Sequence, residues 1–438
     1  MAWVRQILRE ASRLVNDIDE SQRPSAAANI AGAQARAGDL LGAFATAHSL
    51  PKRSDQAMAL GSISWAVAHG GNLAWALNII ATSEEGPSKA IALSQIAEQR
   101  AEVSDFERAL TIARMIRDQL DYRVLTLVRI ATKQWKSGNT RGAERTLREA
   151  LDEVERTQAA NPNSEASGAH SMFLMIAVAQ AALGDRGGAL ATIDRVYAIA
   201  AKADDSGPRE MLLQKLAMAQ AQIGEIQAGL ETARKMLPGH QRDFAFQVIA
   251  DQQAQQGDPR GALETAATIS DPTWRPVVLR RIAHAQSTSG DAAGALETID
   301  SIQGDVERAE ALAEVAFDQA VNVNATAAQT LQLAWEVAKN AQGELPSHVF
   351  GEIAVARGIL GDMAGALEIV DGMKDARSKV WPLWNLTERM VAAGDARGAL
   401  DLAEAQDAPE PKAYALLGLA QGLLDQVDAE RKKQDGSK

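Results

Sequence analysis

The stretch Gly257-Asp258-Pro259-Arg260-Gly261-Ala262-Leu263 decides the fold, because the same pattern recurs along the chain. Clear copies of Gly-Asp-x-x-Gly-Ala-Leu begin at Gly184, Gly290, Gly361 and Gly394. Weaker copies begin at Gly38, Gly71, Ser104, Gly138, Gly224 and Val323. Most successive copies lie 33 or 34 residues apart and three intervals are longer, so the sequence contains eleven repeats.

We call the first residue of each copy the anchor and count other positions from it. The residue eight before the anchor is aliphatic in every copy: Ile30, Ile63, Ile96, Ile130, Ile176, Leu216, Ile249, Ile282, Val315, Ile353 and Leu386. The residue after it is Ala, Ser or Thr, and the residue five after the anchor is Ala or Gly. Positions kept in all copies indicate packing.

These constant positions predict two short helices in each repeat. The first helix covers about fourteen residues before the anchor, which is an ordinary helix length. Glycine readily takes the left-handed conformation that ends a helix, and the Asp or Asn after it is a favoured N-cap for the second helix. Small residues on both helices let their backbones cross closely. No proline falls inside a helix that this pattern predicts.

The repeat resembles the tetratricopeptide repeat, a helix–turn–helix family of nearly the same period. Residues Gly257-Asp258-Pro259-Arg260-Gly261-Ala262 are similar to the connection between its two helices, and Ala250 matches a small residue of its first helix. The resemblance covers roughly residues 23 to 406. Its bulky aromatic positions are mostly Gln or Ala here, and its closing Pro is mostly absent. The resemblance implies an all-α solenoid of stacked helix pairs.

The rest of the chain is predicted to cap this array, since the ends of a stacked repeat expose apolar faces. Residues 1–22 are expected to form an N-terminal capping helix, 23–406 the repeat solenoid, and 407–438 a C-terminal capping helix with a polar tail. The three longer intervals follow the second helices of repeats four, five and nine, where the helical pattern runs on.

The composition argues against several kinds of site. The 438 residues include 45 Lys and Arg against 57 Asp and Glu, a net charge of −12 at neutral pH. Nucleic-acid binding needs a concentrated basic surface, so we expect no such partner. No cysteine is present, which excludes disulfides and cysteine-based metal sites, and no two of the six histidines have the spacing of a helical zinc motif. We predict no metal and no cofactor.

The chain shows no export or membrane signal. Its first ten residues carry charges where a signal peptide has its apolar core, and no stretch reaches the roughly 20 apolar residues of a membrane span. We therefore expect a cytoplasmic protein without a transmembrane segment.

We find no sequence pattern typical of an enzyme. The stretch 184–190 lacks the Gly-Lys-Ser/Thr ending of a phosphate-binding loop, and no Gly-x-Ser-x-Gly elbow occurs. Because the repeats occupy nearly the whole chain, they leave no room for a separate catalytic domain. We predict no catalytic residues.

A glutamine recurs four residues before the anchor in most repeats. Its repetition favours a structural role over ligand contact, and we expect hydrogen bonds between adjacent repeats that satisfy the amide. Replacing Gln253 by Leu is then expected to loosen the array. The seven glutamines are Gln34, Gln134, Gln180, Gln220, Gln253, Gln286 and Gln319.

The position six before the anchor varies freely, and we expect it to line a binding surface. The copies read Gly32, Trp65, Glu98, Thr132, Val178, Met218, Asp251, His284, Phe317, Val355 and Glu388. A surface that meets only solvent would rarely carry Trp, Met and Phe. In the tetratricopeptide family this first-helix position faces the concave groove that holds peptides, so the resemblance implies partner binding there. Trp135, three residues after the variable position, joins the candidates with Trp65 and Met218.

Two patches on this surface are the strongest candidates. Gln247, Asp251, Arg280, His284 and Phe317 lie in three consecutive repeats and are expected to present a polar pocket with an apolar wall. The alternative is that Asp251 and Arg280 simply form an ion pair with each other at the surface.

The second patch comprises Trp381, Trp384 and Glu388, which are expected to form an aromatic anchor of the kind that dominates interfaces. The alternative is that the tryptophans pack on the C-terminal cap.

These observations favour a non-catalytic scaffold that binds a protein or peptide on the concave face of the solenoid. One alternative is a structural component that self-assembles. The other is a small-molecule receptor or enzyme with a pocket near Asp251, Arg280 and His284.

Overall fold

The computed structural model describes residues 1–83, 85–160, 169–200, 206–342 and 344–435. Within these ranges every regular element is a helix and there is no strand. The expected all-α solenoid of helix pairs is confirmed, with one pair for each of the eleven anchors.

The first helix of each repeat ends just before its anchor. These helices are α2 (Arg23–Arg36), α4 (Arg53–His69), α6 (Pro87–Glu102), α8 (Leu120–Lys136), α10 (Ala169–Ala182), α12 (Ser206–Gln222), α14 (His240–Gln255), α16 (Trp274–Thr288), α18 (Asp305–Val321), α20 (Ser347–Ile359) and α22 (Val380–Ala392).

The second helix of each repeat starts after the N-cap. These helices are α3 (Leu40–His48), α5 (Leu73–Ala81), α7 (Phe106–Ala113), α9 (Thr140–Ala160), α11 (Arg186–Ala200), α13 (Ile226–Arg234), α15 (Pro259–Ala266), α17 (Ala292–Asp300), α19 (Ala327–Asn340), α21 (Met363–Gly372) and α23 (Ala396–Glu404). The long members α9, α11 and α19 lie where the sequence predicted a continued helical pattern.

No described proline interrupts a helix interior. Several of them occupy first turns, where the missing N–H costs no intrahelical bond. They include Pro24, Pro87, Pro208, Pro409 and Pro411.

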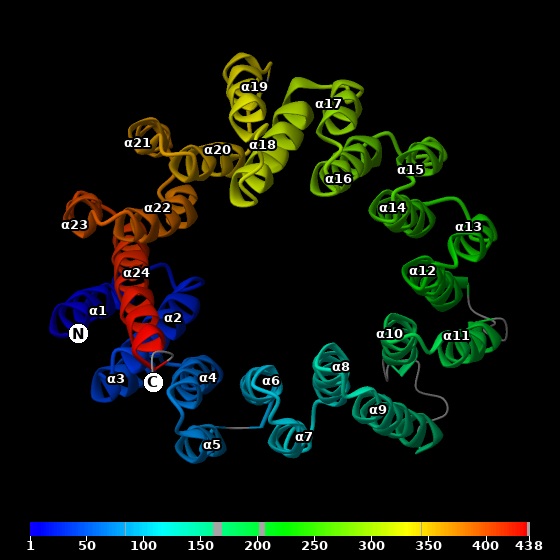
Figure 1. Cartoon of the computed structure of the whole chain (residues 1–438), viewed down its shortest axis with the longest axis horizontal. Coiled ribbons are helices and arrows are strands. Elements are labelled where there is room, and N and C mark those ends of the chain that lie inside the picture. The colour runs from blue at the N-terminus through cyan, green and yellow to red at the C-terminus, as the bar shows by residue number, and fades with distance from the viewer. Residues whose placement is uncertain (84, 161–168, 201–205, 343, 436–438) are drawn as a thin grey trace. The chain divides into compact units, whose positions relative to one another are not determined.

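The chain forms two compact units. Unit 1 comprises Met1–Ile96 together with Ala316–Lys438, and unit 2 comprises Ala97–Val315. Within unit 2 the first helices α8, α10, α12, α14 and α16 pack against one another in chain order, and each packs against its own second helix. The first helices of unit 2 lie on the inner side of its arc and the second helices on the outer side (Figure 1).

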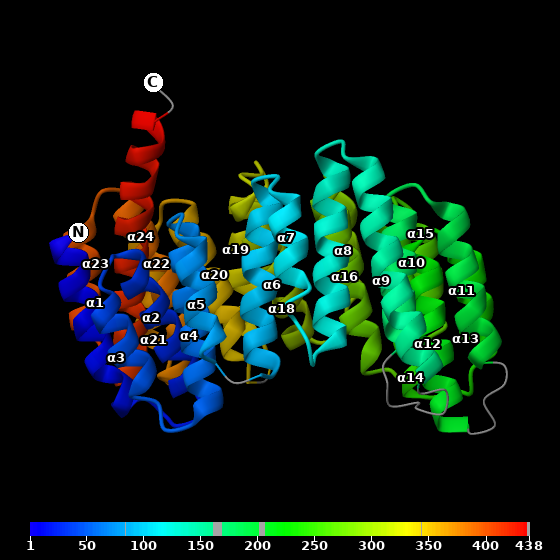
Figure 2. The ribbon, with the colours of Figure 1, turned by 90° about the horizontal axis from the view of Figure 1, so that it is seen from below.

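Unit 1 brings the two ends of the chain together. The C-terminal helix α24 (Pro409–Asp435) packs along α22 on one side, and it contacts α1 (Ala2–Leu14) and α2 on the other. Two short 3-10 helices, η1 (Val15–Asp17) and η3 (Arg377–Lys379), flank this region. Figure 2 shows α24 beside α1 and α2, with its C-terminal end projecting beyond them.

The turn between the two helices has the same backbone in all eleven repeats. Every anchor has positive φ, including Ser104 at 62° and Val323 at 54°, the two described non-glycine residues with positive φ. The residue after each anchor donates its N–H to the carbonyl four residues before the anchor at 2.8–3.1 Å. This bond defines a Schellman motif, which ends a helix by reversing the local hand of the backbone.

The second helix begins with a side-chain N-cap. In the repeat at Gly257, Asp258 Oδ1 accepts the N–H of Gly261 at 2.9 Å. A Cβ on Gly261 would lie 2.1 Å from Asp258 Oδ2 and 2.6 Å from Gln253 Nε2. The second glycine of the pattern is therefore required because the capping carboxylate and the glutamine occupy the space of its side chain.

The recurring glutamine is structural, but the expected bond between adjacent repeats is wrong. Its Oε1 instead accepts the hydroxyl of a threonine twelve residues later, on the second helix of the same repeat. For Gln253 and Thr265 the distance is 2.6 Å and both side chains are buried. The other five pairs are Gln34–Thr46, Gln134–Thr146, Gln180–Thr192, Gln220–Thr232 and Gln286–Thr298.

Val323→Gly is expected to stabilise the protein. A β-branched residue at positive φ costs about 1–2 kcal/mol, and the Val323 side chain is exposed, so little packing is lost. Urea unfolding should show a higher free energy of unfolding by about 1 kcal/mol after the entropy of glycine is counted. Val321→Gly, in the last turn of α18, is the control and should lower the free energy of unfolding. Equal effects of the two substitutions would contradict the conformational cost assigned to Val323.

Gln253→Leu is expected to lower the free energy of unfolding by about 1–3 kcal/mol, because the buried Thr265 hydroxyl loses its partner. The double variant Gln253→Val/Thr265→Ile copies Val67 and Ile79, which occupy the same two positions of repeat two. It should recover most of the loss in a double-mutant cycle of urea unfolding. Additive effects of the two substitutions would count against the bond.

Candidate functional site

All eleven candidate residues lie on first helices. Trp65, Phe317, Trp381, Trp384 and Glu388 belong to unit 1. The members in unit 2 are Trp135, Met218, Gln247, Asp251, Arg280 and His284. Of the expected polar patch, Phe317 belongs to unit 1 and the other four members belong to unit 2.

An apolar groove lies on the first helices α8, α10 and α12 of unit 2. Its volume is about 510 Å³, and its lining includes three consecutive variable positions, Thr132, Val178 and Met218. Leu174 and Met175 of α10 line it as well. Val178, Met175 and Met218 are half-buried, so their side chains are accessible from the groove. We call this cavity the α10 groove.

The α10 groove has a single charged side chain in its lining. Lys215 Nζ of α12 donates to Ser171 Oγ of α10 at 2.8 Å, which ties the two helices together across the groove. The other polar lining groups are Thr132 and Gln222. The groove therefore fits a ligand that presents apolar side chains, with a polar contact at Lys215.

Most residues that line this groove are not among the partner-binding candidates predicted from the sequence. Val128 and Leu174 lie one turn before the variable positions of repeats four and five, on the same helix face. Apolar residues at both positions of neighbouring repeats are the signal that identifies the groove.

The four polar candidates of unit 2 take part in ion pairs or are buried. Arg280 Nη1 lies 2.9 Å from Glu310 Oε2, and Arg280 Nε lies 3.2 Å from Glu314 Oε2. Asp251 pairs with Arg281 at 3.6 Å, so the alternative in which Asp251 and Arg280 pair with each other is wrong, although both side chains do form ion pairs.

The remaining two polar candidates are less available than the sequence implied. Gln247 is 2% exposed. His284 Nδ1 lies 3.9 Å from Glu314 Oε1, so this glutamate faces both the histidine and Arg280. Glu310 and Glu314, which the sequence analysis did not select, hold this cluster together.

The aromatic candidates are mostly engaged with other rings. The Phe317 and Trp381 ring centroids lie 5.5 Å apart in an edge-on arrangement. Trp384 packs against Tyr414 of α24 at 5.8 Å, and Trp65 stacks on His69 at 5.4 Å. Contact with the C-terminal helix, the alternative weighed for the tryptophans, thus occurs for Trp384.

Trp135 lies at a second cavity, of about 490 Å³. Thr140, Glu144 and Arg148 of α9 line it together with Asp185, the N-cap of α11. Trp135 is 41% exposed, so much of the indole is open to a partner.

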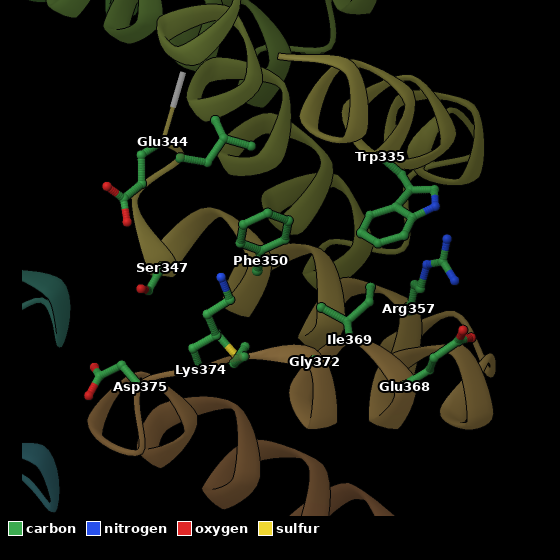
Figure 3. Close-up of a pocket in the computed structure, with 12 residues that line it drawn as sticks. Trp335, Glu344, Ser347, Phe350, Arg357, Glu368, Ile369, Gly372, Lys374 and Asp375 are labelled. Atoms are coloured by element: carbon green, nitrogen blue, oxygen red, sulfur yellow. The ribbon is translucent and has the colours of Figure 1, made fainter. Parts of the chain in front are cut away.

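A third cavity, of about 530 Å³, lies in unit 1 between the second helices α19 and α21 (Figure 3). Trp335 and Phe350 form apolar walls, and Lys374 and Asp375 lie at the opposite side. The Arg357 guanidinium lies 4.9 Å from the centre of the Trp335 ring, a cation–π contact. Apart from Trp335, its lining residues come after the long helix α19 in the chain.

Glu388 lies near α24 at the junction of the chain ends. Burial raises the pKa of Glu388, and the negative charge of Asp425 raises it further, whereas Arg389 and Arg36 lower it. Arg36 Nη2 donates to Asp425 and to Asp428 of α24, each at 2.8 Å. Glu388 is therefore part of the contact between the chain ends.

Among the described residues, no group of three or more His, Asp or Glu side chains is placed to hold a metal ion. In the same part of the chain, none of the helices combines the length and apolar character of a membrane span.

Comparison with known proteins adds solved structures of low similarity. No family model matches the chain, and no curated protein matches it. Ton1535 from Thermococcus onnurineus NA1 shares 16% identity over 75% of this chain and 98% of its own, with a TM-score of 0.35. The APC/C hetero-tetramer Cut9-Hcn1 shares 15% identity over 92% of this chain and 89% of that chain, with a TM-score of 0.27.

Glu388→Gln is expected to raise the thermal unfolding midpoint at neutral pH. A carboxyl whose folded pKa lies above its unfolded pKa costs stability when ionised, and this cost disappears as the pH falls through the folded pKa. The advantage of the variant should therefore shrink between about pH 7.5 and about pH 4. Glu404→Gln, at the exposed end of α23, is the control. A benefit that does not change with pH would contradict the burial of Glu388.

Proposed function

We propose that this protein is a non-catalytic scaffold that binds protein or peptide partners on the first-helix surface. The α10 groove is the primary site in this proposal. Its partner is a peptide segment that inserts aliphatic or aromatic side chains, because the groove walls are apolar and half-buried.

One observation carries the proposal. Positions that are equivalent by the repeat, Thr132, Val178 and Met218, line one continuous cavity on three adjacent first helices. The positions used for packing keep their character in every repeat, whereas these three differ in size and polarity. Variation at an accessible position beside an invariant packing position favours recognition of a ligand over structural support.

The alternative of a small-molecule or catalytic pocket near Asp251, Arg280 and His284 has less support. Arg280 and His284 face Glu314, and Asp251 pairs with Arg281. A ligand would have to replace these ion pairs to reach the charges.

The test is direct selection of binding peptides on the purified full-length protein. A displayed library of linear peptides is panned against it, and the affinity of the selected peptides is measured by fluorescence anisotropy. Met218→Glu puts a charge into the apolar groove and should weaken binding at least about 10-fold, which corresponds to about 1.4 kcal/mol.

Met211→Glu is the matched control, since Met211 lies on the same helix but is exposed and does not line the groove. Binding should be unchanged in this variant. Selected peptides whose affinity is equal in both variants would contradict the proposal. Trp384 is unsuitable for this test because its ring packs on α24, so its loss would affect stability as well.

A further inference from the structure

The two ends of the chain carry the same pattern as the repeats between them. In repeat one, the second helix α3 buries Ala43, Thr46 and Ala47, and Leu50, two residues after its end, is buried as well. The buried residues of α1 have the identical spacing: Val4, Ile7, Leu8 and Ala11. By its burial pattern, α1 therefore resembles the second helix of a repeat.

The C-terminal helix has the complementary pattern. Leu419 and Ala420 of α24 are both fully buried, as are the aliphatic and small residues Ile30 and Ala31 of the first helix α2. Helix α24 packs along α22, as successive first helices do, and also contacts α2. By pattern and contacts, α24 therefore resembles the first helix of a repeat.

Close packing between α24 and α22 depends on two glycines. A Cβ on Gly418 would lie 2.3 Å from the backbone oxygen of Trp384 and 2.4 Å from Thr387 Oγ1. A Cβ on Gly422 would lie 2.9 Å from the Val391 Cβ. The backbones thus approach too closely for any side chain at Gly418.

Polar contacts hold both α1 and α24 in place. Arg9 of α1 pairs with Asp39, the N-cap of α3, at 2.9 Å, and Arg5 Nε donates to the Ala37 carbonyl at 2.8 Å. On α24, Asp425 and Asp428 both accept from Arg36, whose side chain is only 13% exposed. These contacts tie α1 and α24 to repeat one.

We infer that α24 and α1 form a twelfth repeat, in which the C-terminal end of the chain supplies the first helix and the N-terminal end the second. This composite repeat is a clasp that holds the two ends of unit 1 together. The surface formed by α1, α2 and α22 is a binding site for α24, and its occupant belongs to the same chain. When α24 leaves, the apolar faces of all four helices are exposed.

The first experiment measures the separation of the ends in the full-length protein. The chain has no cysteine, so cysteines introduced at the exposed positions Ala2 and Ala429 are the only sites for spin labels. Packed helices lie about 10 Å apart. Double electron–electron resonance should therefore give a single short, narrow distribution of distances between the two spin labels. A broad distribution in this labelled protein would overturn the inference.

Gly418→Ala is the variant that opens the clasp, because its methyl group meets the backbone of α22. It should broaden the distance distribution and lower the unfolding midpoint by roughly 5 °C or more. Gly187→Ala is the matched control, since a Cβ there meets nothing within 4 Å. An unchanged distance in Gly418→Ala would overturn the inference.

A circular permutant provides an independent test. Joining residue 435 to Met1 by a flexible Gly/Ser linker, with new ends between Pro238 and Gly239, makes the twelfth repeat continuous in sequence. If the ends form one repeat, the permutant should keep the oligomeric state and the helical content of the parent protein, with a midpoint within a few degrees of it. A permutant that unfolds or aggregates, together with an unaltered distance in Gly418→Ala, would show that the ends do not form a repeat.

Discussion

The left-handed turn at the anchor is the constraint on which the whole architecture depends. Each first helix must end within one residue, and the Schellman bond to the carbonyl four residues before the anchor enforces this in all eleven repeats. The turn persists at Ser104 and Val323, where the residue itself opposes positive φ. Packing of the two helices is therefore strong enough to impose the conformation, and glycine lowers its cost in the other nine.

In six of the eleven repeats a side-chain hydrogen bond joins the two helices. Six repeats use the Gln–Thr hydrogen bond, and Gln–Thr pairs of this kind must be complete, because an unpaired buried hydroxyl or amide is costly. Repeat two has Val67 and Ile79 at these positions, and repeat eleven has Met390 and Leu402. In repeats three, nine and ten the first position is polar and the second apolar, as Arg100–Ile112, Gln319–Leu331 and Arg357–Ile369. The hydrogen bond is therefore one of several side-chain combinations that the two positions accept.

The sequence was sufficient to predict the fold because its evidence is local and repeated eleven times. The positions of the turns, the paired helices and the buried aliphatic residue all follow from that period. The glutamine bond was assigned to the wrong partner because the sequence analysis did not compare the position of Thr265 and its equivalents with that of the glutamine. Once the helices are known to be antiparallel, a partner twelve residues later on the facing helix is the geometric expectation.

The charged candidates were harder to predict than the fold. Arg280 pairs with Glu310 and Asp251 with Arg281, in both cases 30 residues apart, whereas the repeats at these positions are 33 residues apart. The difference of three residues is the stagger between adjacent first helices, which no single repeat encodes. Long flexible side chains then choose among several partners within reach, so only the three-dimensional arrangement decides the pairing.

The α10 groove and the chain ends differ in whether their apolar side chains are covered by another helix. At the ends, the apolar faces of α1 and α24 cover each other, and Trp384 and Glu388 belong to that contact. These two residues therefore resemble the packing positions of an ordinary repeat, although they looked like a binding patch in the sequence. In the α10 groove, Val178 and Met218 are also apolar, but no helix of unit 2 covers them. An apolar residue at a variable position indicates a partner only where the fold leaves it uncovered, and in unit 2 the α10 groove meets that condition.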